Sequence, residues 1–138
     1  MSQINAFQVE QIGLTILVTP TRNLLEFEID DLLNCDPGGA IEILESERAR
    51  NVIIDCRNLC RCCSSGIAVF IRLGKRSQAQ RGRMAFCHVL HPIHNMLELT
   101  NLTALWPVFA SMADAIAYVE AGERLLETHD EALAGERR

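Results

Sequence analysis

The stretch VIIDCRNLCRCCSSGIAVFIRLGKRSQAQRG, from Val52 to Gly82, decides the fold. It begins with a β-branched run that is typical of a strand buried on both faces. After a cysteine-rich connection, apolar residues recur at the i, i+3, i+4 and i+7 spacing of an amphipathic helix. The stretch therefore predicts a buried strand at Asn51–Asp55 and a helix at Ser65–Gln80, which Gly82 ends.

Segments of the same two kinds lie on either side of this unit, and turn residues separate them. Working outward, we expect a strand pair within Gln8–Thr19 around Gly13, a helix at Ala40–Arg48, a strand at Arg83–Leu90, a helix from His91-Pro92, an edge strand at Leu105–Phe109 and a helix opened by the capping residue Ser111. The segment Thr21–Pro37 is compatible with a strand or a helix, with LLEFEIDDLL as its apolar part. The alternation predicts an α/β fold, with a mixed, mainly parallel sheet of four to six strands and about four helices.

The composition indicates a single compact domain over residues 1–138, with 119–138 as a helical or frayed C-terminal tail. The chain has 138 residues, 49% hydrophobic and 22% charged, with no internal repeat or linker-like stretch. Its net charge of −5 argues against nonspecific binding to nucleic acid. The first residues lack the pattern of a signal peptide, and no apolar run is long enough to span a bilayer. We therefore expect a cytoplasmic protein that does not insert into membranes.

Basic residues gather in the central part of the chain. Between Asn51 and Arg83 there are seven basic residues, and Asp55 is the one acid. Such a surface suits an acidic protein partner or a phosphate group. A solvated helix face would give the same pattern, so both interpretations stay open.

Two adjacent serines lie at the predicted start of the helix that follows the buried strand. Ser64 is a natural N-cap, which leaves Ser65 in the first turn and Gly66 behind it. Free backbone N–H groups and the helix dipole favour negative charge at this point, so a phosphate on a serine would be tolerated there. Plain helix capping explains the same residues.

Taken together, these segments resemble a STAS domain of the anti-sigma factor antagonist type. The family has a hydrophobic strand ending in Asp, a short linker, Asp-Ser-Ser-Gly and a helix ending in basic residues and Gly. Here the pattern needs no gap from Asp55 to Gly66, and the later motifs Leu-x-Leu-Thr at Leu97–Thr100 and Ser-x-x-x-Ala at Ser111–Ala115 follow in the family's order. The resemblance implies a STAS-like fold and a regulatory domain that is not an enzyme.

The resemblance also implies a partner and a site. In the family, a kinase-type anti-sigma factor phosphorylates the serine before the glycine, which is Ser65 here, with Ser64 as second choice, and phosphorylation releases that partner. The implied partner-binding residues are Cys63, Ser64, Ser65, Gly66, Arg72, Lys75 and Arg76. Cys63 stands where the family has an Asp beside the acceptor, so binding without a switch stays open, as do a scaffold role and an accessory role to a transporter.

The cysteines offer a rival hypothesis, a redox or metal sensor. Cys56, Cys60, Cys62 and Cys63 form C-x3-C-x-C-C, which lacks the paired C-x2-C knuckles of structural zinc sites. We therefore expect no metal and no cofactor, with Cys56 and Cys62 as small buried hydrophobes. A thiol at Cys62 or Cys63, near a helix N-terminus and arginines, could instead be reactive. His88, His91 and His94 are expected to diverge, and Asp55 is expected to bond backbone N–H groups.

Overall fold

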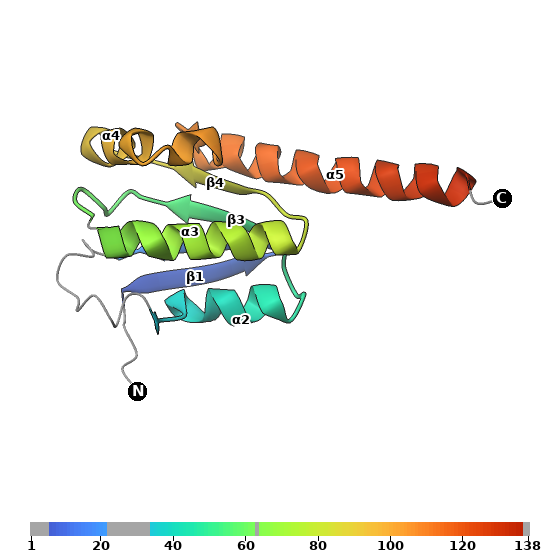
Figure 1. Ribbon diagram of the computed structural model, residues 1–138, viewed down its shortest axis with the longest axis horizontal. Coiled ribbons are helices and arrows are strands. Elements are labelled where there is room, and N and C mark those ends of the chain that lie inside the picture. The colour runs from blue at the N-terminus through green and yellow to red at the C-terminus, as the bar shows by residue number, and fades with distance from the viewer. Residues whose placement is uncertain (1–5, 22–33, 63, 137–138) are drawn as a thin grey trace.

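The computed structural model describes residues 6–21, 34–62 and 64–136, and the ambiguous segment 24–33 lies outside them. Figure 1 shows a sheet with helices packed across it and a long C-terminal helix that runs on past the sheet. The described elements are β1 (Phe7–Ile12), β2 (Thr15–Pro20), η2 (Pro37–Gly39), α2 (Ala40–Glu45), β3 (Asn51–Asp55), α3 (Ser64–Ala79), β4 (Met84–Cys87), α4 (His91–Leu99), η3 (Leu102–Ala104), β5 (Val108–Phe109) and α5 (Met112–Glu136).

The sheet has the strand order β1-β2-β3-β4-β5. The first two strands are antiparallel and joined by a two-residue hairpin, in which Gly13 has a φ of 60° that suits glycine. The remaining pairs are parallel, and helices make the crossovers. The described residues thus hold five strands and four α-helices in a mixed, mainly parallel sheet, which confirms the predicted fold class.

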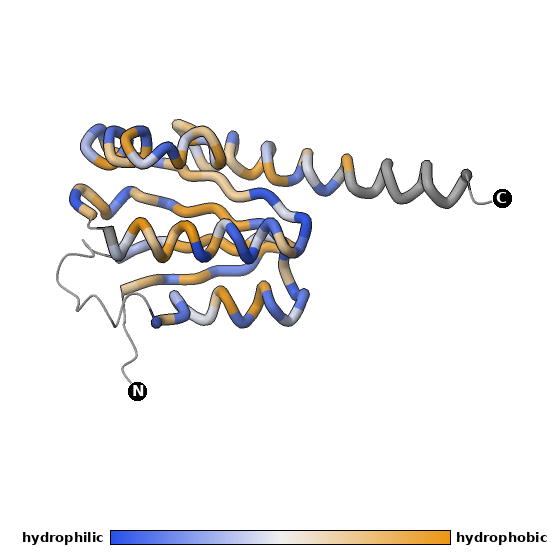
Figure 2. Tube along the Cα trace, in the orientation of Figure 1, coloured by the Kyte–Doolittle hydropathy of each residue, from blue (hydrophilic) through white to orange (hydrophobic). Residues whose placement is uncertain are grey.

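The two faces of the sheet are covered unequally. Even-numbered residues of the central strands, such as Val52 and Ile54, face α2, α3 and α4 in the larger apolar core. Odd-numbered residues, such as Ile53 and Ala85, meet α5 in a smaller cluster. Figure 2 shows apolar and polar residues alternating along these helices, as expected for amphipathic helices that cover a sheet. Because β3 is covered on both faces, all five of its residues are buried, as its sequence predicts.

Two local expectations need correction. The predicted edge strand Leu105–Phe109 is shorter, because β5 holds two residues after Pro107. The helix α3 ends before Gly82, but the left-handed residue at its end is Arg81, with a φ of 62°. Gly82 serves a different purpose: a Cβ there would lie 1.8 Å from the Arg50 carbonyl oxygen. This glycine therefore allows two backbone segments to approach closely.

Asn51 organises the polar contacts at the end of the sheet where the parallel strands begin. Its side chain is buried, donates to Thr15 Oγ1 at 3.4 Å and Glu123 Oε1 at 2.6 Å, and accepts from the Arg83 backbone N–H at 2.9 Å. Arg83 in turn donates to the Tyr118 carbonyl at 3.0 Å and lies 4.6 Å from the Tyr118 ring centre. One amide therefore ties β2, β3, β4 and α5 together.

Candidate functional site

The start of α3 differs from the expected exposed turn. The helix begins at Ser64, and Ser65 retains only 4% of its accessible surface. The reason is periodicity: Ser65, Val69 and Leu73 follow at i, i+4 and i+8 on one helix stripe, and the other two are fully buried in the core. Gly66 is buried as well, and Cys63 lies outside the described residues. The hydroxyl of Ser65 is therefore not presented to solvent in this conformation.

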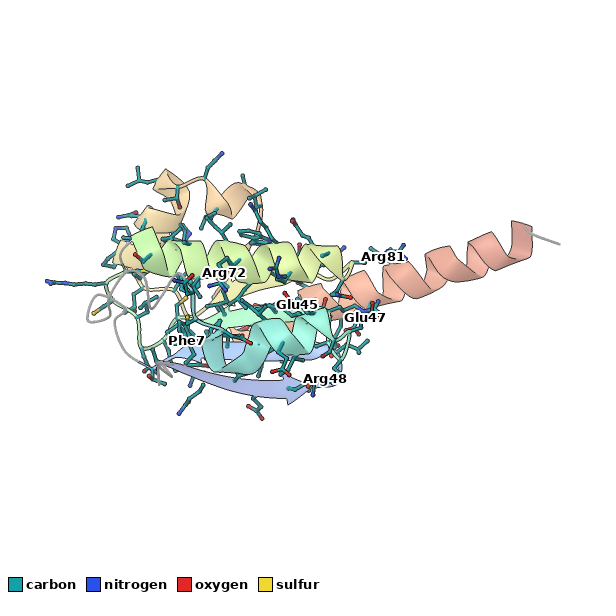
Figure 3. All side chains as sticks on the ribbon, turned by 60° about the horizontal axis from the view of Figure 1, so that its bottom comes forward. Phe7, Glu45, Glu47, Arg48, Arg72 and Arg81 are labelled. Carbon is teal, nitrogen blue, oxygen red and sulfur yellow. The ribbon has the colours of Figure 1, made fainter. Side chains whose placement is uncertain are left out.

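The basic residues of α3 lie on the exposed side of the helix. Lys75 and Arg76 are exposed, whereas Arg72 is half-buried. Arg76 Nε donates to Glu45 Oε1 of α2 at 2.9 Å, a solvated ion pair that contributes little to stability. Figure 3 shows this side, with Arg72 and Glu45 labelled between α3 and α2. Part of the predicted basic surface thus faces the acidic helix next to it.

The cysteines of the β3–α3 connection are mostly part of the core. Cys56 and Cys62 are buried among apolar side chains, which confirms their expected role as small hydrophobes. Burial, with smaller contributions from Cys87 and Asp55, raises the pKa of the Cys56 thiol far above its ordinary value. Cys60 is exposed. The cysteines of this connection that the structure describes do not gather into a metal-binding group.

An ionic cluster of Asp55, Arg57 and His88 lies at the end of β3. Sequence patterns alone did not bring these residues together. The Asp55 side chain is only 3% exposed. One carboxylate oxygen, Oδ2, accepts from Arg57 Nε at 2.7 Å, while Oδ1 accepts from the Arg57 backbone N–H at 3.1 Å and lies 3.1 Å from His88 Nδ1. The backbone bond confirms the expected role of Asp55, and the pairing with His88 is new.

The protonation of Asp55 follows from this arrangement. Burial alone raises the pKa of the carboxyl group. The hydrogen bonds from Arg57 and His88 and the charge of Arg57 outweigh that effect, so the pKa of Asp55 lies below its ordinary value. The carboxylate is therefore ionised at neutral pH, and its charge is held by a guanidinium group that is itself 57% exposed.

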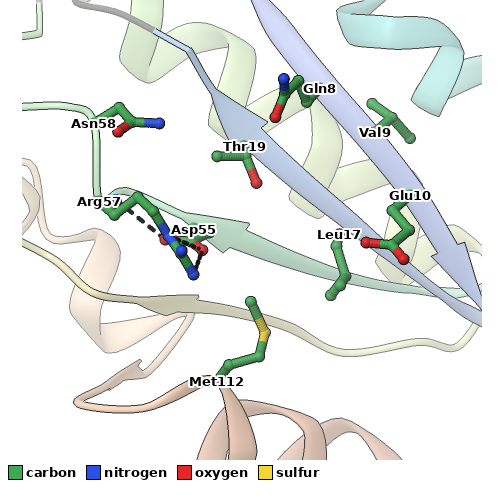
Figure 4. Close-up of a pocket in the computed structure, with 9 residues that line it drawn as sticks. All are labelled: Gln8, Val9, Glu10, Leu17, Thr19, Asp55, Arg57, Asn58 and Met112. Atoms are coloured by element: carbon green, nitrogen blue, oxygen red, sulfur yellow. Dashed lines mark hydrogen bonds and ion pairs between the residues drawn. The ribbon is translucent and has the colours of Figure 1, made fainter.

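Two cavities adjoin this cluster. The larger has a volume of about 650 Å³ and lies on the α5 side of the sheet, against β1 and β2; Figure 4 shows its lining, which includes Thr19, Asp55, Arg57 and Met112. The smaller, about 480 Å³, is lined by Arg57, His88, Val89 and Leu90. Since ligands of open α/β sheets bind beyond the carboxyl ends of parallel strands, this is the end of the molecule where chemistry is expected.

A signal for the cluster was present in the sequence in two separate pieces. Asp55 ends one predicted strand, and the Cys87-His88 pair lies in the next one. The register pairs Asp55 with Cys87 across β3 and β4, which brings the pieces together. His91 and His94 do not join them: both lie on α4, where His94 Nδ1 is 3.2 Å from Glu98 Oε1. The expected divergence of the histidines is thus confirmed.

Comparison with known proteins agrees with this fold. The family described as STAS domain matches residues 8–115. The anti-sigma F factor antagonist of Paenibacillus polymyxa is 25% identical over 79 residues, covering 57% of this chain and 68% of that protein. Within the described residues, no helix is both long enough and apolar enough to cross a membrane.

Solved structures share the architecture at low sequence identity. A candidate anti-sigma factor antagonist from Thermotoga maritima aligns with a TM-score of 0.69 and 14% identity, covering 84% of this chain and 96% of that one. The anti-sigma factor antagonist SpoIIAA in its unphosphorylated form aligns with a TM-score of 0.60 and 15% identity, covering 87% and 97%. Its phosphorylated form, described as a Bacillus cell fate determinant, aligns with a TM-score of 0.62 and 16% identity, covering 83% and 99%.

Proposed function

Because this chain belongs to the STAS domain family, and is related to the anti-sigma factor antagonists within it, we propose that it regulates transcription by binding a kinase-type anti-sigma factor. The family assignment makes the chain a non-enzymatic regulatory domain, so any phosphoryl transfer would be carried out by the partner. The proposal places the protein in the cytoplasm, where transcription factors of this kind act.

The observation that carries the proposal is the position of the β3–α3 unit. The connection and the start of α3 lie at the carboxyl end of the parallel strands, beside the exposed cationic side chains of Arg57 and Arg61, and Arg72, Lys75 and Arg76 continue the basic character further along α3. The proposed docking surface consists of Cys63, Ser64, Ser65, Gly66, Arg72, Lys75 and Arg76. A cationic rim of this kind would steer an acidic partner and set the rate of association more than the final affinity.

The proposed phosphoacceptor is Ser65, with Ser64 as second choice. The support is the placement of Ser65 directly before Gly66, together with the existence of SpoIIAA in phosphorylated and unphosphorylated forms. Burial of Ser65 adds a requirement: the first turn of α3 must open before a kinase can reach the hydroxyl. A phosphate carries a charge near −2 and cannot return to an apolar site unpaired, so it would keep that turn open.

This coupling gives the switch a physical basis. Ser65 packs in the same stripe as Val69 and Leu73, so displacing it loosens the helix start that the partner would contact. Phosphorylation would then remove the partner both by repulsion and by a change of shape. Cys63 stands where the family has an Asp, so the chain lacks the carboxylate that would orient the hydroxyl there, and binding without a switch is the alternative.

The decisive experiment isolates the chain with its natural partner and adds ATP. The expected result is an ATP-binding anti-sigma factor as partner, one phosphate on Ser65 by tandem mass spectrometry, and release of the partner. Ser65→Ala should abolish both phosphate and release, while Ser64→Ala should keep both. Recovery of a transporter subunit instead would contradict the proposed partner; retention of the phosphate in Ser65→Ala would contradict the proposed acceptor alone.

The docking surface is tested by a charge pair of variants. Lys75→Glu should weaken association at least tenfold at low salt, because it reverses a charge in the proposed surface. Arg48→Glu is the matched control, since Arg48 is also exposed but lies in the α2–β3 connection. Equal loss in both variants would show a general charge effect rather than this surface.

A further inference from the structure

We propose that Asp55, Cys87 and His88 form a binding site for a divalent transition-metal ion of the zinc class. The three residues come from the ends of two neighbouring parallel strands, and one ligand atom from each lies within 4.8 Å of the other two. The set differs from the C-x3-C-x-C-C run, and the inference does not depend on the proposed partner.

The ligand types suit such an ion. Zinc is bound by thiolate sulfur, imidazole nitrogen and carboxylate oxygen, and catalytic sites commonly use three protein ligands. Two ligand atoms about 2.1 Å from a tetrahedral ion are separated by roughly 3.4 Å. His88 Nδ1 and Asp55 Oδ1 are already 3.1 Å apart, so a small separation would admit the ion between them.

The backbone explains how adjacent residues can serve one ion. In a regular strand, Cys87 and His88 would point to opposite faces of the sheet. The strand β4 ends at Cys87, and His88 has a φ of 52°, in the left-handed region that histidine visits more readily than most residues. This turn of the chain brings the imidazole to the same side as the carboxylate of Asp55.

The surroundings meet the other requirements of a metal site. The Arg57 guanidinium binds Asp55 Oδ2 and fixes the orientation of the carboxylate. On ion binding, Oδ1 would exchange its contact with His88 Nδ1 for the ion and keep the hydrogen bond from the Arg57 backbone N–H. His88 lines the 480 Å³ cavity and Asp55 lines the 650 Å³ cavity, so an ion could approach the cluster from either cavity. On binding, the Cys87 thiol gives its proton to solvent, and the thiolate and carboxylate balance the charge of the ion.

The buried environment sets the cost of that step. Burial and the neighbouring Asp55 raise the pKa of the Cys87 thiol to about 12, so the metal-free protein holds it protonated at neutral pH. An ion bound here would join the end of β3 to the end of β4. It would thereby fix the start of the connection that leads to α3.

In the test, the full chain is first reduced and then freed of metal with a chelator. It is then titrated with Co²⁺ in the absence of oxygen. We expect one equivalent to bind with an absorption band from sulfur-to-cobalt charge transfer, and Zn²⁺ to displace it. Cys87→Ala should abolish the band, and His88→Asn, which tolerates the left-handed backbone, should weaken binding at least tenfold.

Matched controls separate this site from adventitious thiol binding. Cys60→Ser and His91→Asn remove the same residue types outside the cluster and should leave Co²⁺ binding unchanged. Thermal unfolding of the metal-free variants checks that each is folded. If Cys87→Ala does not fold, His88→Asn decides the question. Absence of a cobalt band in the parent chain, survival of the band without Cys87, or unchanged affinity in His88→Asn would overturn the site.

Discussion

The two ends of β3 carry the two most informative buried polar residues of the sheet, and they are used differently. Asn51, at the beginning of the strand, is neutral and makes hydrogen bonds to three other elements. Asp55, at its end, is ionised and bound to a half-exposed arginine and to His88, with a cavity on each side. The neutral, buried amide of Asn51 holds the fold together, whereas the ionised carboxylate of Asp55 beside open space can exchange its partners. The difference indicates that the beginning of β3 serves stability and its end serves function.

The largest expected effect is a loss of stability from a change near the beginning of β3. Gly82→Ala would place a methyl group 1.8 Å from the Arg50 carbonyl oxygen, which is backbone and cannot rotate away. We expect a loss of about 3 kcal/mol in the free energy of unfolding, measured with urea. The control is Gly39→Asn, at a left-handed position with open space around it, which should cost far less. Equal losses would mean that the close approach is not what requires Gly82.

A smaller loss is expected for Asn51→Ala. The substitution leaves the part-buried Arg83 N–H without its acceptor and removes the link to Glu123. We expect destabilisation by about 2 kcal/mol. Partner affinity and Co²⁺ affinity, measured below the unfolding transition, should stay at the level of the parent chain. A loss of partner or Co²⁺ affinity in Asn51→Ala would contradict the different roles of the two ends of β3.

For Asp55→Asn we expect the opposite pattern, a small loss of stability and a large loss of metal binding. The amide can still accept the Arg57 backbone N–H but loses the charge that holds the guanidinium, and the freed Arg57 is solvated. We expect a stability loss of about 1 kcal/mol. Binding of Co²⁺ should fall at least tenfold, because an amide oxygen is a poorer ligand than a carboxylate for a zinc-class ion. A stability loss larger than that of Asn51→Ala would assign Asp55 a mainly structural role.

The smallest effect concerns the thiols of the β3–α3 connection. Cys60 is exposed, whereas burial raises the pKa of Cys56, so only Cys60 of this pair should react rapidly with a disulfide reagent in the native protein. Cys60→Ser should remove one fast-reacting thiol, and Cys56→Ser should remove none. In denaturant, both variants should lack one thiol relative to the parent chain. Loss of a fast thiol in Cys56→Ser would show that the connection opens readily.

Much of the fold could be predicted because the apolar residues of each element follow a single periodicity, that of a strand or that of a helix. The β-branched run before Asp55 and the i, i+3, i+4 pattern after Gly66 each fit one structure only. Local geometry was harder. The left-handed residue after α3 is Arg81 rather than Gly82, since glycine was needed for an approach between Gly82 and Arg50 that no sequence pattern records.

The site was predicted less completely, for two physical reasons. Helix capping places Ser64 at the N-cap and predicts an accessible Ser65 in the first turn, although the spacing of Ser65 to Val69 places it on the buried stripe. The pairing of Asp55 with His88 depends on the register between β3 and β4 and on the backbone turn at His88. Neither can be obtained from the spacing of residues along one segment.

Hydrogen exchange of the chain, alone and bound to the partner that co-purifies with it, tests most directly which end of the molecule is functional. We predict slower exchange on binding over residues 56–76, which include the connection and the start of α3, and no change around Asn51 and Arg81–Arg83. Protection around Asn51, or confined to α5, with residues 56–76 unchanged, would contradict the division of roles between the two ends of β3.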